Sequence, residues 1–214
     1  MMRPALRALQ QAAVLLLLAS SSFASGVTLQ ELVDEMIKIS KEKTEALGKV
    51  SDFTPVQLEE LYNTIGLGAL KFFLLRVDPK KKMIFNPEES IDFHGFTGPF
   101  IQYTHARIKS ILRKTGTAVT LTTNELLPLE KQLAIELSLF PAIINEAADN
   151  LDPSKIAIYA FNLAKLFNTF YTEHSIANAD TDTKKQLRIK IGILTAATLQ
   201  KAMGCLGIAV PEQM

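Results

Sequence analysis

Hydrophobic positions recur every three or four residues through nearly all of residues 28–214, while alternation at every second residue is scarce. This periodicity is typical of amphipathic helices and not of strands. Thr28 and Glu31 have the spacing of a capping box, and Gly48 offers a stop for the helix that they open. One side of that helix carries four apolar residues: Leu29, Leu32, Val33 and Met36. The pattern predicts an all-α fold, a helical bundle.

A second helix is predicted from Thr54, as N-cap, with Pro55 at the first helical position, to about Val77. Gly66 and Gly68 lie inside it, and a glycine in a helix interior costs about 1 kcal/mol relative to alanine. We therefore expect another backbone to approach closely at these two glycines.

A non-helical connection is predicted for residues 78–97, since it contains two prolines, a glycine and a run of three lysines. Gly98 and Pro99 open the next predicted helix, which runs to about Lys114. Up to four more helices are predicted, at Glu125 to Ser138, Pro141 to about Asn150, Pro153 to His174, and Asp182 to about Leu206.

The first 25 residues have a different pattern. Arg3 and Arg7 precede an apolar run at 12–19, and small residues follow up to Ala24. This order is typical of a cleavable secretory signal, and the apolar run is too short to span a bilayer.

The charge balance excludes binding to nucleic acid or anionic lipid through the overall charge of the molecule. The 214 residues include 23 Lys and Arg against 22 Asp and Glu, a net charge of +1. No whole-molecule field therefore attracts the chain to nucleic acid or anionic lipid, and a nucleic-acid site has to be local.

The sequence shows no common catalytic constellation. His94, His105 and His174 stand outside any zinc-binding spacing, and neither a P-loop nor a G-x-S-x-G motif is present. The acidic group at Glu88, Glu89 and Asp92 is more typical of a turn or helix start than of a cation site. We expect no catalytic residue and no metal ligand.

The helix predicted from Gly98 has features suited to RNA. It carries the donors and cations Gln102, Arg107, Lys109, Arg113 and Lys114, together with the polar aromatic residues Tyr103 and His105. Recognition of single-stranded RNA needs flat side chains for unstacked bases and cations for phosphates. The alternative is a solvated basic face over a packed core.

Long gapless stretches of the chain resemble arginyl-tRNA synthetases. ALKFFLLRVDPKKKMIFNPEESIDFHGFTGPFIQYTHARIKSILRK, at 69–114, is similar to the segment that joins the class I catalytic domain of that family to its anticodon-binding helical bundle. Residues 129–176 and the ending LGIAVPEQM resemble the bundle itself, a domain of the DALR type. The resemblance implies three parts: a signal-like or spurious segment at 1–25, a remnant of the end of the catalytic domain with its connecting loop at 26–97, and the anticodon-binding bundle at 98–214.

The resemblance implies tRNA-Arg as the partner, with no DNA and with no membrane beyond the signal-like segment. Tyr103, Tyr171 and Met214 match the family positions that line a pocket for an unstacked anticodon base. Gln102, Arg107, Lys109 and Arg113 are assigned to sugar, phosphate or domain-interface contacts.

The chain departs from the family in lacking a His-x-Gly-His signature, so the ATP and arginine sites are assigned to a catalytic domain outside this sequence. We therefore expect no cofactor in this chain and no aminoacylation by the chain alone. We also expect an apolar patch, exposed by the missing domain, around Phe72, Phe73, Phe93 and Phe96.

Two alternatives remain open. The chain is an exported helical protein that binds another partner and has no RNA role, or it is one half of a split synthetase that a separate catalytic half completes. The first of these follows from the signal-like segment, whereas the family resemblance favours the cytoplasm.

Overall fold

The computed structural model describes residues 28–46, 48, 52–117 and 125–214, so the signal-like pattern at 1–25 lies outside the described residues. Within these ranges the chain forms helices and no strand, which confirms the predicted all-α fold. The helices are α2 (Leu29–Ala46), α3 (Pro55–Leu75), α4 (Pro87–Ser90), α5 (Gly98–Thr115), α6 (Pro128–Asn150), α7 (Ser154–Glu173) and α8 (Asp182–Cys205).

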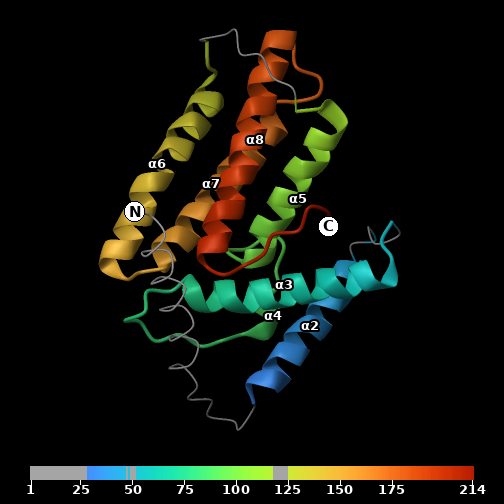
Figure 1. Ribbon diagram of the computed structural model, residues 1–214, viewed down its shortest axis with the longest axis vertical. Helices are drawn as coiled ribbons and strands as arrows, with labels where there is room; N and C mark the ends of the chain where they lie inside the picture. Colours follow the sequence, from blue (N-terminus) through green and yellow to red (C-terminus); the bar gives the residue numbers. More distant parts are fainter. Residues whose placement is uncertain (1–27, 47, 49–51, 118–124) are drawn as a thin grey trace.

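Four helices, α5 to α8, stand side by side as a bundle, and α3 lies across one end of it with α2 beneath (Figure 1). The bundle core is built around large buried side chains of α7 such as Phe167 and Phe170. A second apolar cluster joins α2 to α3 through residues such as Met36 and Ile65. Because Phe72 of α3 belongs to the bundle core, α3 links the two clusters.

The predicted starts of the first two helices are confirmed by their caps. The Thr28 amide donates to Glu31 Oε2 at 2.7 Å, and the Glu31 amide donates to Thr28 Oγ1 at 3.2 Å. Thr54 and Gln57 form the same reciprocal pair at the start of α3. Leu29, however, is 53% exposed and does not join the buried side of α2, because the apolar contact with α3 begins one turn later, at Leu32.

The glycines of α3 lie where other backbones approach, as predicted. A Cβ on Gly66 would lie 2.9 Å from Met36 O of α2. On the other side of α3, a Cβ on Gly98 would lie 2.8 Å from Gly68 O. The three helices α2, α3 and α5 are therefore in backbone contact, which places the start of α5 firmly against α3.

One predicted helix break does not occur. The two helices expected at Glu125 to Ser138 and Pro141 to Asn150 form the single helix α6, with Pro141 inside it. Leu133 and Ala147, one on each side of the proline, are both fully buried in the bundle core. Packing of both halves against the bundle outweighs the loss of one helical hydrogen bond at an exposed position.

The prediction of an exposed patch of phenylalanines is also wrong. Phe72, Phe73 and Phe93 are 0%, 5% and 9% exposed. Phe96 is partly buried, with its ring centroid 5.5 Å from that of Phe72. The connection at 78–97 folds back over α3, as the 5.1 Å contact between the rings of Phe73 and Phe85 shows, so the chain covers these rings itself.

None of the helices in the described part of the chain is both long enough and apolar enough to span a membrane.

Candidate nucleic-acid interface

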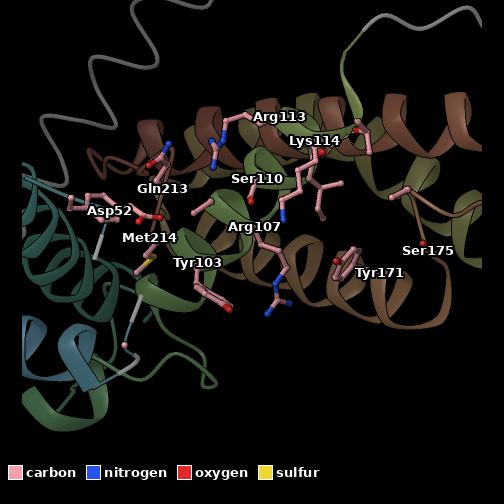
Figure 2. A pocket seen from close by; sticks show the side chains of 16 residues that line it. Asp52, Tyr103, Arg107, Ser110, Arg113, Lys114, Tyr171, Ser175, Gln213 and Met214 are labelled. Carbon is pink, nitrogen blue, oxygen red and sulfur yellow. Dashed lines mark hydrogen bonds between the residues drawn. The ribbon is translucent and has the colours of Figure 1, made fainter. Parts of the chain in front are cut away.

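An open pocket of about 670 Å³ lies where α5, the end of α7, the turn between α2 and α3, and the C-terminal residues meet (Figure 2). Its volume is within the range of about 300–1,000 Å³ typical of small-ligand sites. The lining residues are Gly48, Asp52, Phe53, Tyr103, Ala106, Arg107, Ser110, Ile111, Arg113, Lys114, Thr115, Tyr171, Ser175, Ala177, Gln213 and Met214.

Helix α5 supplies one side of the pocket through its helical period. Tyr103, Arg107, Ser110 and Lys114 follow one another at steps of three or four residues and therefore share one face. The opposite face of α5 is buried in the bundle core through residues such as Ile108. The buried face fixes the rotation of α5, so its polar face is turned into the pocket.

The Arg107 guanidinium lies between two tyrosine rings. Its central carbon is 4.7 Å from the ring centroid of Tyr103 and 6.0 Å from that of Tyr171. Arg107 Nη1 also donates to Asn168 Oδ1 at 2.8 Å, and Asn168 Nδ2 donates to Thr104 Oγ1 at 2.9 Å. The side chains of Tyr103, Arg107 and Tyr171 consequently form a row in the pocket, as Figure 2 shows.

The ring of Tyr171 is accessible. It is 37% exposed and stacks on the buried Phe167, with an interplanar angle of 7° and a centroid distance of 6.4 Å. The contact with Phe167 fixes the plane of the tyrosine ring. The sequence left open whether Tyr171 belongs to a pocket or to the core, and the structure places it in the pocket lining.

The C-terminal residues reach the pocket because side chains of α3 and α5 hold the preceding backbone. Lys71 Nζ donates to Gly207 O at 2.8 Å, Gln102 Nε2 to Ala209 O at 2.8 Å, and Arg113 Nη1 to Glu212 O at 3.0 Å. His105 Nδ1 lies 2.9 Å from Pro211 O. Burial lowers the pKa of His105, against smaller opposing contributions from Pro211 and Glu212, so the ring is neutral near pH 7 and its Nδ1–H donates to Pro211.

Of the seven site residues predicted from the sequence, the structure brings five to one pocket: Tyr103, Arg107, Arg113, Tyr171 and Met214. Lys109 instead forms an ion pair with Glu212, with Nζ and Oε2 2.9 Å apart. Gln102 is 0% exposed, and its amide donates to Thr64 O and Ala209 O. The buried Gln102 is therefore not accessible to a sugar or phosphate, whereas the domain-interface contact that was the other assignment agrees with its bond to Thr64 O of α3.

Sequence reasoning missed several lining residues. Ser110 follows Tyr103 by seven residues, and this helical spacing could have indicated it. No local signal indicates Asp52 and Phe53, since they reach the pocket through the packing of α2 on α3. Ser175 and Gln213 likewise depend on long-range contacts.

The pocket has a local positive charge. Among the described residues, its lining includes the basic side chains of Arg107, Arg113 and Lys114 and the acidic side chain of Asp52. A concave surface with an excess of one charge focuses the field of that charge. The pocket therefore favours an anionic ligand, although the whole chain is nearly neutral.

The acidic cluster of the connection is used in structural ion pairs. Glu88 pairs with Lys43 at 3.1 Å, and Glu89 pairs with Arg76 at 3.0 Å. Across the described ranges, no group of three or more His, Cys, Asp or Glu side chains is arranged to hold a metal ion.

An all-α bundle with aromatic, cationic and thioether groups around one open pocket defines the class of the protein as a helical binding domain. The chain belongs to the family of the DALR anticodon binding domain, whose sequence pattern matches residues 101–214.

Curated relatives extend the similarity beyond that domain. The chain is 46% identical over 189 residues to the arginine--tRNA ligase of Flavobacterium psychrophilum, covering 88% of this chain and 31% of that protein. It is 41% identical over 194 residues to the arginine--tRNA ligase of Bacteroides fragilis, with 88% and 32% covered. The chain thus spans about a third of the length of the curated relatives it matches.

Solved structures agree with this membership. The arginyl-tRNA synthetase of Thermus thermophilus superposes with a TM-score of 0.83 at 30% identity, covering 90% of this chain and 33% of that chain. The arginyl-tRNA synthetase of Plasmodium falciparum gives a TM-score of 0.73 at 23% identity, with 88% and 34% covered, which shows the shared fold.

Proposed function

We propose that this chain binds the anticodon stem-loop of tRNA-Arg and holds one unstacked anticodon base in the pocket. The observation that carries the proposal is the row of Tyr103, Arg107 and Tyr171 with Met214 beside it and cations at the rim. Membership in an anticodon-binding family and similarity to proteins named arginine--tRNA ligase support it.

The groups of the pocket match the chemistry of an unstacked nucleotide. A tyrosine face stacks on a base of any identity, and the planar Arg107 guanidinium, bonded to Asn168, offers a second flat surface. The thioether of Met214 is an adaptable apolar wall. Stacking of this kind contributes about 1–3 kcal/mol per base.

Phosphates are assigned to the rim. The side chains of Arg113 and Lys114 are exposed at the end of α5 and line the pocket. Guanidinium and ammonium groups bind phosphate oxygens with charge-assisted hydrogen bonds, and each phosphate that they neutralise releases counterions. Binding should therefore weaken as the salt concentration rises.

We assign ATP and arginine binding, and thus aminoacyl transfer, to parts of the relatives outside the third that this chain matches. Arginine-dependent ATP–pyrophosphate exchange checks this assignment. We expect none from the chain alone, and exchange above the buffer background would contradict the assignment.

We also place the protein in the cytoplasm, where tRNA is charged. Fractionation of cells that produce the full chain checks this placement. An N-terminus at Ser25 in an exported fraction would instead support the exported alternative.

The experiment for the proposed function measures the affinity of the chain for tRNA-Arg and for the same tRNA with a substituted anticodon, at two salt concentrations. We expect tighter binding to the native anticodon and weaker binding at the higher salt concentration. Equal affinities for the two tRNAs at both salt concentrations would contradict recognition of the anticodon.

Matched lysine variants locate the site. Lys114→Ala removes a cation at the rim, so we expect the slope of log affinity against log salt to fall by about 0.7–0.9, the contribution of one phosphate contact. Lys201→Ala removes an exposed cation of α8 that does not line the pocket, and the slope should stay unchanged. An equal change of the slope in both variants would show that the RNA binds outside the pocket.

A further inference from the structure

Gln102 connects three parts of the fold although it is completely buried. Its Nε2 atom donates to Thr64 O of α3 at 3.0 Å and to Ala209 O of the C-terminal segment at 2.8 Å. Gln102 itself belongs to α5, one residue before the pocket residue Tyr103. A single amide group therefore fixes the C-terminal backbone relative to both helices.

The surrounding backbone leaves room for this side chain. A Cβ on Gly68 would lie 2.5 Å from Gln102 Nε2, so any residue other than glycine at position 68 would displace the amide. Gly68 and Gly98 also allow α3 and α5 to approach each other at this level. The position of the Gln102 amide thus depends on a glycine of the neighbouring helix.

If Gln102 contributed only to stability, an apolar side chain of the same shape would be more favourable than its amide. Among the described residues, Gln102 Oε1 has no hydrogen-bond partner. A buried acceptor without a partner is unfavourable compared with an apolar side chain of the same shape. The two donated bonds, which direct the C-terminal segment, are what this glutamine provides and a leucine does not.

The C-terminal segment that follows Ala209 forms a wall of the pocket. Gln213 and Met214 line the pocket, while Pro211, Glu212 and Gln213 line a second depression on the side facing α3. The segment therefore separates two hollows, and its path determines where the Met214 side chain lies. Further along α5, Lys109 and Arg113 also contact this segment, and both do so at Glu212.

We propose that Gln102 is a positioning residue of the pocket: by holding Ala209 O against α3 it sets the place of Met214, the wall against which the bound base rests. The proposal rests on the proposed function for the identity of the ligand. The placement of Met214 itself is measured without RNA.

The first measurement is a methyl spectrum of the full chain labelled at its methionines, in the wild type and in Gln102→Leu. Met36 and Met203 are fully buried, one in each apolar cluster, so their methyl signals report the two cores. We expect the Met214 signal, assigned with Met214→Ala, to move toward the position of a disordered methionine while the two core signals stay in place. An unmoved Met214 signal, or equal changes in all three signals, would overturn the proposal.

A second variant covers the case in which Gln102→Leu fails to fold. Gln102→Asn keeps the amide but shortens it by one methylene, so it cannot reach Thr64 O and Ala209 O together. We expect the same selective movement of the Met214 signal. As a matched control, Thr195→Val removes a fully buried hydroxyl whose bond within the described part of the chain is to Ile191 O of α8, at 2.8 Å, and should leave the Met214 signal unchanged.

Affinity for the tRNA-Arg anticodon stem-loop completes the test. We expect Gln102→Leu to weaken binding about fivefold, which is the lower end of the contribution of a stacked base. In the Met214→Ala background the same substitution should have no further effect, because the wall is already absent. If Gln102→Leu still weakened binding in the Met214→Ala background, a role of Gln102 through Met214 would be overturned. Absence of RNA binding in the wild type would refute the proposed function, and the methyl spectra would then decide whether Gln102 positions Met214.

Discussion

A buried carboxylate, Glu130, should be among the most sensitive positions for stability. It is 0% exposed at the start of α6, and its oxygens lie 2.8 Å from Lys184 Nζ and 3.0 Å from Arg188 Nε. It also accepts a hydrogen bond from the Leu127 amide at 2.9 Å. Arg188 in turn donates to Ser175 O at 2.6 Å, so this network supports a residue that lines the pocket.

The expected loss of stability on substituting Glu130 follows from the burial of its partners, Arg188 and Lys184. Glu130→Gln removes the negative charge, and the Arg188 side chain, which is 5% exposed, then loses the carboxylate that lies 3.0 Å from its Nε. Breaking a buried ion pair on one side costs about 3–5 kcal/mol. We expect a loss near the lower end, about 3 kcal/mol, because the glutamine oxygen still accepts one hydrogen bond and Lys184, at 19% exposure, can turn to water.

Urea unfolding followed by far-ultraviolet circular dichroism measures the loss, and thermal unfolding should show a midpoint about 6–12 °C lower. Glu130→Gln/Arg188→Met should be more stable than the single variant, since no uncompensated buried charge remains. A loss below about 1 kcal/mol for Glu130→Gln would refute the reasoning from a buried charge network.

The same carboxylate predicts a pH dependence. Burial raises the pKa of Glu130, but the hydrogen bonds from Lys184, the Leu127 amide and Arg188 outweigh it, and the net pKa lies below the ordinary glutamate value. A lowered pKa in the folded state stabilises the fold above the unfolded value of about 4.3, and this contribution is lost as the pH falls through the folded pKa. The difference in stability between wild type and Glu130→Gln should therefore shrink below about pH 4.

The remaining predictions concern the backbone. Gly66→Ala should destabilise the chain by about 1–3 kcal/mol, since the new methyl group would lie 2.9 Å from Met36 O, whereas Gly204→Ala meets no atom within 4 Å and should leave the unfolding midpoint unchanged or slightly higher. Equal losses in the two alanine variants would contradict the close contact of α2 and α3. Leu151→Gly should stabilise by about 1 kcal/mol, because Leu151 ends α6 at a φ of 51° and is 61% exposed, and a lower midpoint in urea would contradict this account.

The sequence predicts local features of this fold well. The capping box at Thr28 is signalled by a hydroxyl and a carboxylate three positions apart, the cap at Thr54 by the proline that follows it, and the close approach at Gly66 by a glycine that weakens its own helix. Likewise, the shared face of Tyr103 and Arg107 follows from helical spacing alone. Such features depend on neighbours within one or two helical turns.

Features that depend on distant partners could not be predicted in this way. The bond from Gln102 to Ala209 joins residues 107 positions apart, and its polar side chain on a basic helix resembled a ligand-binding group. Glu130 similarly resembled an ordinary first-turn acid, because its partners Lys184 and Arg188 lie on α8. The division at residue 97 remains a prediction, with α3 contributing to both apolar clusters.

The central claim, that an anticodon base rests against the tyrosines of the pocket, is tested most directly by a double-mutant cycle between protein and RNA. The affinities of wild type and Tyr103→Ala are measured for tRNA-Arg with its native anticodon and with one anticodon base removed as an abasic site. We expect each change alone to weaken binding by about 1–3 kcal/mol and the abasic change to have little further effect in Tyr103→Ala, because both remove the same stacking contact. Losses that add fully at every anticodon position would show that the base and Tyr103 do not touch, and would contradict the account.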